Sequence, residues 1–290
     1  MHPFLAQVLA KGPVITDGAW GTQLQARGLA QGAAPDAWNL TYPERVEEVP
    51  RAYLAAGSQI VLTNTFQANR LTLAGHGLDG QLAQINTAGV EISLRAALGK
   101  AHVFASIGPT GKMLFMGQTT AEELTQVYAE QAACLAAAGA EGLVIETMSD
   151  LEEAKLALAA AKTTGLPVVV CMVFDSGKDF DRTMMGTTVE QAARELEAAG
   201  ADALGANCGQ GPAGYVAIGR RLRAATTLPL WLKPNAGLPQ FQDGQVFYST
   251  TPLEFADAAT RLLADGASFL GGCCGTGPEF IRAVVERVAR

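Results

Sequence analysis

Short apolar segments rich in β-branched residues recur along the whole chain, and longer stretches rich in alanine and leucine separate them. Such short segments have the length and composition of buried strands. The pattern predicts strands at residues 13–17, 59–64, 103–107, 142–146, 167–173, 203–207, 230–234 and 268–272.

The spacing of these strands indicates how they are connected. Consecutive strands begin 25 to 46 residues apart, which leaves room for one helix and two loops. The intervening segments have helical periodicity and end on glycine, as 119–138 does before Gly139 and 188–199 does before Gly200. Strands that alternate with helices predict a parallel sheet. We therefore expect an α/β fold, a single-domain TIM (β/α)8 barrel over residues 1–290, with a doubly wound open sheet as the alternative.

Two connections are longer than a minimal link between a strand and a helix. Residues 18–43 are rich in Gly, Gln and Ala and contain Trp20 and Trp38, and residues 174–186 carry several charged side chains. Long loops of a barrel commonly form lids or substrate walls. Both segments are expected to lie over the barrel mouth.

Composition and charge narrow the classes of partner. Hydrophobic residues make up 49% of the 290 residues and charged residues 17%, which suits a large buried core. The net charge of -7 argues against nucleic acid, because binding phosphates requires clustered Lys and Arg. The chain shows neither a signal segment nor an apolar run of about 18 residues. We expect no nucleic acid, no membrane and a cytoplasmic location.

Cysteines supply the candidate chemistry. Five cysteines without a secretion signal are expected to be reduced thiols or metal ligands. Cys208 ends one predicted strand, and Cys273 and Cys274 follow another in a glycine-rich turn. Three thiolates with one open position predict a catalytic Zn²⁺ site, the alternative being three small buried thiols. Cys134 and Cys171 are expected to be core thiols.

The barrel fold predicts that these three cysteines lie close together. Chemistry in this fold gathers at the C-terminal ends of the strands, where inward residues of alternate strands share a layer. The predicted sixth and eighth strands are two apart, so Cys208 can face the 273–274 turn.

A glycine-rich run at 209–214 matches a dinucleotide fingerprint, but Pro212 removes an amide and the expected later acidic residue is missing. We assign those glycines to the turn.

Several motifs, taken in order, resemble the homocysteine S-methyltransferase family over nearly the whole chain. They are DGAWGT at 17–22, TNTF at 63–66, SIGPTG at 106–111, ET at 146–147, GANCG at 205–209, KPNAG at 233–237 and GGCCGT at 271–276. That family includes betaine- and S-methylmethionine-dependent enzymes and the homocysteine-binding domain of cobalamin-dependent methionine synthase.

The resemblance implies a TIM barrel whose zinc is held by Cys208, Cys273 and Cys274. It also implies roles for substrate-binding residues. Asp17 and Glu146 would receive the amino group of homocysteine, and backbone amides at the turn from Asp17 to Gly18 would hold its carboxylate. Read from the residues alone, Asp17 can equally cap a helix, and Glu146 can pair with a barrel lysine. The remaining residues expected to shape the pocket are Thr65, Phe66 and Asn207.

The expected reaction follows from the metal. Zinc binding removes the proton of a thiol whose pKa is otherwise about 8.5 and leaves the sulfur able to attack. Homocysteine is expected to enter as the fourth ligand and to take a methyl group by in-line displacement, giving methionine.

The methyl donor stays open at this stage. Gln67 and Thr147 stand where the betaine-dependent branch has aromatic residues, which weakens betaine as the donor. None of the three histidines fits a cobalamin-ligand motif. S-methylmethionine, S-adenosylmethionine and a methylcorrinoid protein remain. Three other functions stay open: a homocysteine-binding subunit of a corrinoid-dependent assembly, a methyltransferase for another thiol, and a zinc hydrolase.

Overall fold

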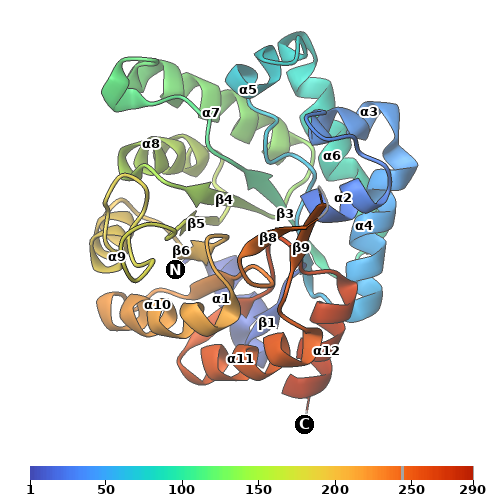
Figure 1. Ribbon diagram of the computed structural model, residues 1–290. Coiled ribbons are helices and arrows are strands. Elements are labelled where there is room, and N and C mark those ends of the chain that lie inside the picture. Colours follow the sequence, from blue (N-terminus) through green and yellow to red (C-terminus); the bar gives the residue numbers. More distant parts are fainter. Residues whose placement is uncertain (243–244, 290) are drawn as a thin grey trace.

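The computed structural model describes residues 1–242 and 245–289, which form a ring of strands enclosed by helices (Figure 1). Within these residues, eight parallel strands form one sheet in the order β1-β10-β7-β6-β5-β4-β3-β2. The strands are β1 Val14–Ile15, β2 Ile60–Val61, β3 His102–Ile107, β4 Gly142–Met148, β5 Val168–Met172, β6 Ala203–Asn207, β7 Leu230–Lys233 and β10 Ala267–Leu270. Between β1 and β2, the two ends of this order, the backbone N–H of Gln59 donates to Ile15 O at 2.7 Å. The predicted TIM barrel is confirmed, and the open sheet is wrong.

The first two strands are shorter than the sequence predicts. β1 and β2 have two residues each, whereas the apolar runs cover 13–17 and 59–64. Beyond them a side chain replaces the ladder, since Leu62 N donates to Asp17 Oδ2 at 2.8 Å. Hydrophobic periodicity cannot reveal that a side chain takes the place of a backbone partner, because the residues are buried in both cases.

Helices flank the sheet after each strand of the barrel. They are α4 Pro43–Ala56, α6 Leu82–Ala97, α7 Ala121–Ala137, α8 Leu151–Lys162, α9 Val189–Ala198, α10 Pro212–Ala225, α11 Pro252–Ala264 and α12 Pro278–Val288. Thr120 caps α7 by accepting from Glu123 N, and Thr188 caps α9 by accepting from Gln191 N. Gly139 and Gly200 follow these two helices with positive φ, as their helix-stop role predicts.

Two apolar layers hold the barrel. The larger lies between the sheet and the helices, and the smaller fills the ring with inward residues that include Phe104, Val169 and Trp231. Leu5 of α1 (Pro3–Val8) joins the inner layer. Cys171 is buried there, as predicted, whereas Cys134 on α7 is only half-buried. Of the helices described, none combines the length and the apolar character that crossing a bilayer requires.

The connections carry short elements. Residues 18–43 contain α2 Gly21–Ala26, η2 Pro35–Ala37 and α3 Trp38–Thr41. In the second connection, Arg182 forms isolated bridges with Ser176 and with Thr188. An antiparallel hairpin that the sequence analysis did not foresee, β8 Pro239–Gln242 with β9 Gln245–Tyr248, follows β7. The remaining short helices are η1 Leu9–Lys11, α5 Arg70–Ala74, η3 Asp79–Gln81 and η4 Leu114–Met116.

Candidate metal centre and substrate pocket

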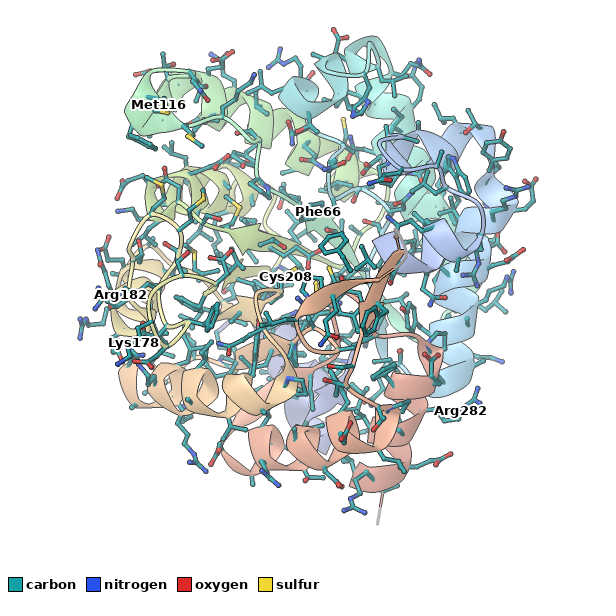
Figure 2. The ribbon with its side chains drawn as sticks, viewed as in Figure 1. Phe66, Met116, Lys178, Arg182, Cys208 and Arg282 are labelled. Carbon is teal, nitrogen blue, oxygen red and sulfur yellow. The ribbon has the colours of Figure 1, made fainter. Side chains whose placement is uncertain are left out.

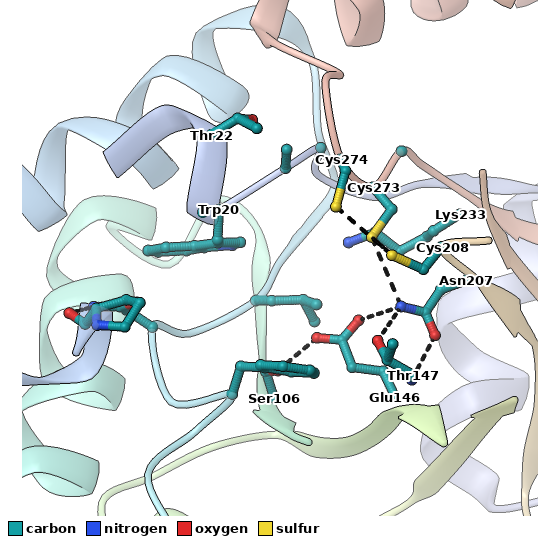
Figure 3. A pocket seen from close by; sticks show the side chains of 18 of the residues that line it. Trp20, Thr22, Ser106, Glu146, Thr147, Asn207, Cys208, Lys233, Cys273 and Cys274 are labelled. Carbon is teal, nitrogen blue, oxygen red and sulfur yellow. Dashed lines mark hydrogen bonds between the residues drawn. The ribbon is translucent and has the colours of Figure 1, made fainter. Parts of the chain in front are cut away.

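The three predicted ligand cysteines meet at the C-terminal end of the barrel (Figure 3). Cys208 follows β6, and Cys273 and Cys274 follow β10, with β7 between these two strands. The Sγ atom of Cys208 lies 3.5 Å from that of Cys273 and 3.6 Å from that of Cys274. All three sulfur atoms lie within 4.8 Å of one another.

The end of β7 holds both cysteine segments in place. Cys208 N donates to Lys233 O at 3.1 Å, and Cys273 N donates to Pro234 O at 2.8 Å. Gly275 closes the turn with φ of 81°, and a Cβ there would lie 2.3 Å from the ring of Tyr248. The glycine is therefore required by backbone conformation and by contact with the hairpin.

The donor set and its spacing fit a soft divalent cation. Sulfur atoms around a tetrahedral zinc with Zn–S bonds of about 2.3 Å lie about 3.8 Å apart, close to the distances found here. A disulfide would need about 2.05 Å. Just after β7, the buried side-chain oxygen Oδ1 of Asn235 has no hydrogen-bond partner in the described part of the chain.

The thiols also influence each other's ionisation. Hydrogen bonds with Cys208 and Cys273 lower the pKa of Cys274 to about 3. Hydrogen bonds with the other two thiols, together with burial, raise the pKa of Cys208 well above its ordinary value. Like charges this close oppose one another, so full ionisation of the cluster requires a cation.

A cavity of about 310 Å³ adjoins the sulfur atoms. Such a volume is at the lower end of the range for small-molecule sites. Figure 2 shows Phe66 and Cys208 near the centre of the ring, and both line this cavity. The other lining residues that the sequence predicted are Gly18, Glu146, Asn207, Cys273 and Cys274.

Glu146, two residues before the end of β4, presents a carboxyl group to the cavity. Its Oε1 accepts from Ser106 Oγ at 2.5 Å, and its Oε2 accepts from Asn207 Nδ2 at 3.4 Å. Burial raises the pKa of Glu146 to about 7, and the positive charge of Lys233 opposes this rise. Asn207 is itself fixed, because its Oδ1 accepts from Thr147 N at 2.7 Å.

Asp17 and Thr65 lie behind the cavity surface. Asp17 is fully buried, and its Oδ2 accepts from Trp20 Nε1 and Leu62 N, each at 2.8 Å. Its Oδ1 pairs with Lys233 Nζ at 2.5 Å. Thr65 donates its hydroxyl to Ser106 O at 2.7 Å. The predicted contact of Asp17 with an amino group stays a prediction.

Lys233 and Asp36 are pocket residues to which the sequence analysis gave no role. Lys233 appeared only within the KPNAG motif at 233–237, although a lysine buried in a barrel requires an anionic partner. Asp36 lies in η2 within the long first connection, where periodicity carries no signal. Its Oδ1 accepts from Gln67 N at 3.0 Å, and burial raises its pKa to about 7.

Two curated proteins with similar sequences are much longer than this chain. The chain is 31% identical over 307 residues to methionine synthase of Mycobacterium leprae and 32% identical over 306 residues to that of Mycobacterium tuberculosis. These alignments cover 99% and 98% of this chain but 25% of each relative. The chain thus spans about a quarter of the length of these curated relatives.

Solved structures and a family model complete the comparison. The homocysteine methyltransferase MmuM from Escherichia coli is 25% identical in its metallated form, with a TM-score of 0.81, covering 98% of this chain and 99% of that one. Its oxidized form has the same identity and coverage with a TM-score of 0.82. The model of the family described as homocysteine S-methyltransferase matches residues 14–288. The chain belongs to the homocysteine S-methyltransferase family.

Proposed function

We propose that this protein transfers a methyl group to the thiol of homocysteine, giving methionine, with Zn²⁺ held by Cys208, Cys273 and Cys274. The observation that carries the proposal is the placement of three clustered sulfur atoms on the wall of a cavity that also presents Glu146. Family membership supports the substrate. When bound, zinc would supply a deprotonated, nucleophilic substrate thiol at neutral pH.

The chain's own residues orient the substrate. Glu146, held by Ser106 and Asn207, accepts the substrate ammonium group. Trp20 and Phe66 line the cavity and exclude water from the reacting sulfur. A bond forms between the substrate sulfur and the methyl carbon as the donor's bond to that carbon breaks, so no side-chain base is needed for the transfer.

For the donor, we propose two chemical classes that one assay separates. A small sulfonium, S-methylmethionine or S-adenosylmethionine, suits the aromatic ring of Trp20 and the carboxyl group of Asp36 in the same cavity. A methylcorrinoid protein suits the methionine synthase relatives, in which the matching region is about a quarter of the chain.

The test is methionine formation by zinc-loaded protein with homocysteine and, in parallel, S-methylmethionine, S-adenosylmethionine, betaine or free methylcobalamin. Bound zinc is quantified in the same samples. Turnover with one donor establishes the reaction and the donor class. One equivalent of zinc and homocysteine binding without turnover would instead favour a homocysteine-binding subunit of a corrinoid-dependent assembly. Protein that binds no zinc would overturn the proposal.

A further inference from the structure

The hairpin β8–β9 lies over the mouth of the barrel and is tied to the cysteine turn (Figure 1). Ala236 N donates to Cys274 O at 2.9 Å, and Thr250 N donates to Ala236 O at 3.0 Å. These two bonds join the base of the hairpin to one of the candidate metal ligands. Tyr248, the last residue of β9, is thereby held at the edge of the cysteine cluster.

Tyr248 packs its ring against the turn that carries Cys273 and Cys274. A Cβ on Gly275 would clash with Cγ and Cδ2 of this ring. The hydroxyl of Tyr248 donates a hydrogen bond to the sulfur of Cys274. The side chain is half-buried, which partly shields this bond from water. A donor that is not itself a candidate ligand is therefore directed at one of the three sulfur atoms.

Cys273 has a separate polar partner. Asn207 Nδ2 donates to Cys273 Sγ at 3.8 Å, and Asn207 is held in turn because its Oδ1 accepts from Thr147 N. Within the described residues, the sulfur of Cys208 contacts only the other two thiols. The two neighbouring cysteines of the turn thus receive their hydrogen bonds from different elements, Cys273 from β6 and Cys274 from the hairpin.

A methyl donor in the cavity meets several reactive sulfur atoms. All three cysteines line the cavity, and a bound thiol substrate adds a fourth sulfur. The thiolate is the nucleophilic form of each. Methylation of a cysteine would convert an anionic ligand into a neutral thioether, whereas zinc in proteins is bound by anionic cysteine sulfur. The site therefore requires a means of directing the methyl group to the substrate sulfur.

A hydrogen bond to a thiolate lowers its reactivity toward carbon. The shared proton withdraws electron density from the sulfur lone pair, and the bond must weaken before an electrophile can approach that lone pair. Hydrogen bonds with one ionised partner are about twice as strong as neutral ones. Groups that hydrogen-bond to metal ligands also orient the ligands and strengthen metal binding. The hydroxyl of Tyr248 has the position required for both effects at Cys274.

We propose that Tyr248 is a positioning residue of the zinc site, whose hydrogen bond holds Cys274 on the metal and keeps this sulfur from taking the methyl group. The bond to the methyl carbon then forms at the substrate thiolate, as the donor's own bond to that carbon breaks and its electron pair leaves with the donor. This inference rests on the proposed function, since it takes the cluster as a zinc site that meets a methyl donor.

The test replaces Tyr248 by Phe, which keeps the ring against Gly275 and removes only the hydroxyl. Tyr42→Phe is the matched control, because Tyr42 is 47% exposed and packs against Trp38. Zinc affinity is measured by competition with a chromogenic chelator. Separately, each protein is saturated with zinc and treated with methyl iodide in the absence of homocysteine, and tandem mass spectrometry gives the methylation rate of each cysteine.

Tyr248→Phe should bind zinc about tenfold more weakly, as expected when a group hydrogen-bonded to a metal ligand is removed. Cys274 should be methylated about tenfold faster relative to Cys273, which keeps its bond from Asn207 and serves as the internal reference. An unchanged ratio of the two rates would mean that Tyr248 only supports the turn, and would overturn the inference. A zinc affinity equal to that of Tyr42→Phe would overturn it as well.

The circular dichroism spectrum of each variant checks that it is folded. Neither readout uses homocysteine, so the two proposals fail separately. If Tyr248→Phe shows the expected ratio but the wild type transfers no methyl group from any donor, the proposed function fails and the role of Tyr248 stands. If the wild type forms methionine and the ratio in the variant is unchanged, only the role of Tyr248 fails.

Discussion

Two residues of the pocket that are not glycine have left-handed backbone conformations. Thr147 has φ of 63° and Cys208 has φ of 64°, each of which costs about 1–2 kcal/mol. Hydrogen bonds hold both, since Thr147 N donates to Asn207 Oδ1 and the hydroxyl of Tyr215 donates to Cys208 O, each at 2.7 Å. Both residues lie at strand ends where the candidate chemistry lies, and such strain is common at functional sites.

Replacing Cys208 by Ala should abolish zinc binding and methyl transfer together. Two sulfur ligands are too few to hold a tetrahedral zinc that also keeps an open position. Bound zinc, measured by elemental analysis, should fall from about one equivalent to a trace. Cys134→Ala on α7 is the matched control and should keep its zinc, because Cys134 lies outside the cluster. Full zinc occupancy in Cys208→Ala would contradict the ligand assignment.

At the scale of elements, β6 and β7 leave no room for a side chain at Gly205. A Cβ on Gly205 would lie 1.7 Å from the backbone oxygen of Trp231, its register partner. Because backbone atoms form this contact, the strands would have to separate to admit a methyl group. The approach matters to the site, because β6 carries Cys208 and β7 carries Lys233.

Gly205→Ala should therefore lower the free energy of unfolding by at least about 1–3 kcal/mol, the usual cost of overpacking. Urea unfolding measures this change. Gly80→Ala is the control, since nothing lies within 4 Å of a Cβ at that position. If both variants unfold at the wild-type midpoint, the close approach of the two strands is wrong.

Charged side chains join α9 and α10 on the outside of the barrel. Arg221 donates to both oxygens of Glu190, at 2.6 Å and 2.8 Å, and also to Asp181 at 2.7 Å. The hydrogen bonds from Arg221 lower the pKa of Glu190 from 4.5 to about 2. A carboxylate with a lowered folded-state pKa stabilises the fold above its unfolded pKa and loses that effect as the pH falls through the folded value.

Glu190→Gln should thus be less stable than the wild type at pH 7, and the difference should shrink between about pH 4.5 and pH 2. Urea unfolding at a series of pH values measures this difference. Both partners are about one third exposed, so solvent screening keeps the effect modest. A difference that persists unchanged down to pH 2 would show that the ion pair is not its source.

At the scale of the whole molecule, the N-terminal helix α1 packs against the inner layer of the barrel. Leu5 is fully buried in the cluster that includes Val14, Ile60 and Phe269 of three strands. The sequence analysis predicted no helix there, since six residues give too short a stretch for periodicity. Its packing is decided by the ring of strands that it covers.

Leu5→Ala should lower the free energy of unfolding by about 2–5 kcal/mol, because it opens a cavity in this layer. Leu253→Ala on α11 is the control, since Leu253 is 75% exposed and should change stability by no more than about 0.5 kcal/mol. Zinc content should not change in either variant. Equal stability of the two variants would place α1 outside the core.

The sequence predicted the architecture because its determinants are local. Apolar runs gave the eight strands, glycines after Ala138 and Ala199 marked helix ends, and regular alternation predicted the barrel. The fold rule that strand ends converge then indicated that Cys208, Cys273 and Cys274 meet, and the structure brings them within 4.8 Å. The early ends of the first two strands and the hairpin after β7 were not predicted, because they depend on side-chain bonds and on packing at the mouth.

By itself, then, the sequence determined the βα repeat, the family motifs and the grouping of the three cysteines, all of which follow from residue type and order along the chain. Only the tertiary structure decided which charged groups lie on the surface of the cavity. Asp17 and Lys233 are 216 residues apart, and their pairing removes Asp17 from the cavity surface while leaving Glu146 and Lys233 on it. Charge pairing in a buried site depends on distances between strand ends, and no local pattern in the sequence contains those distances.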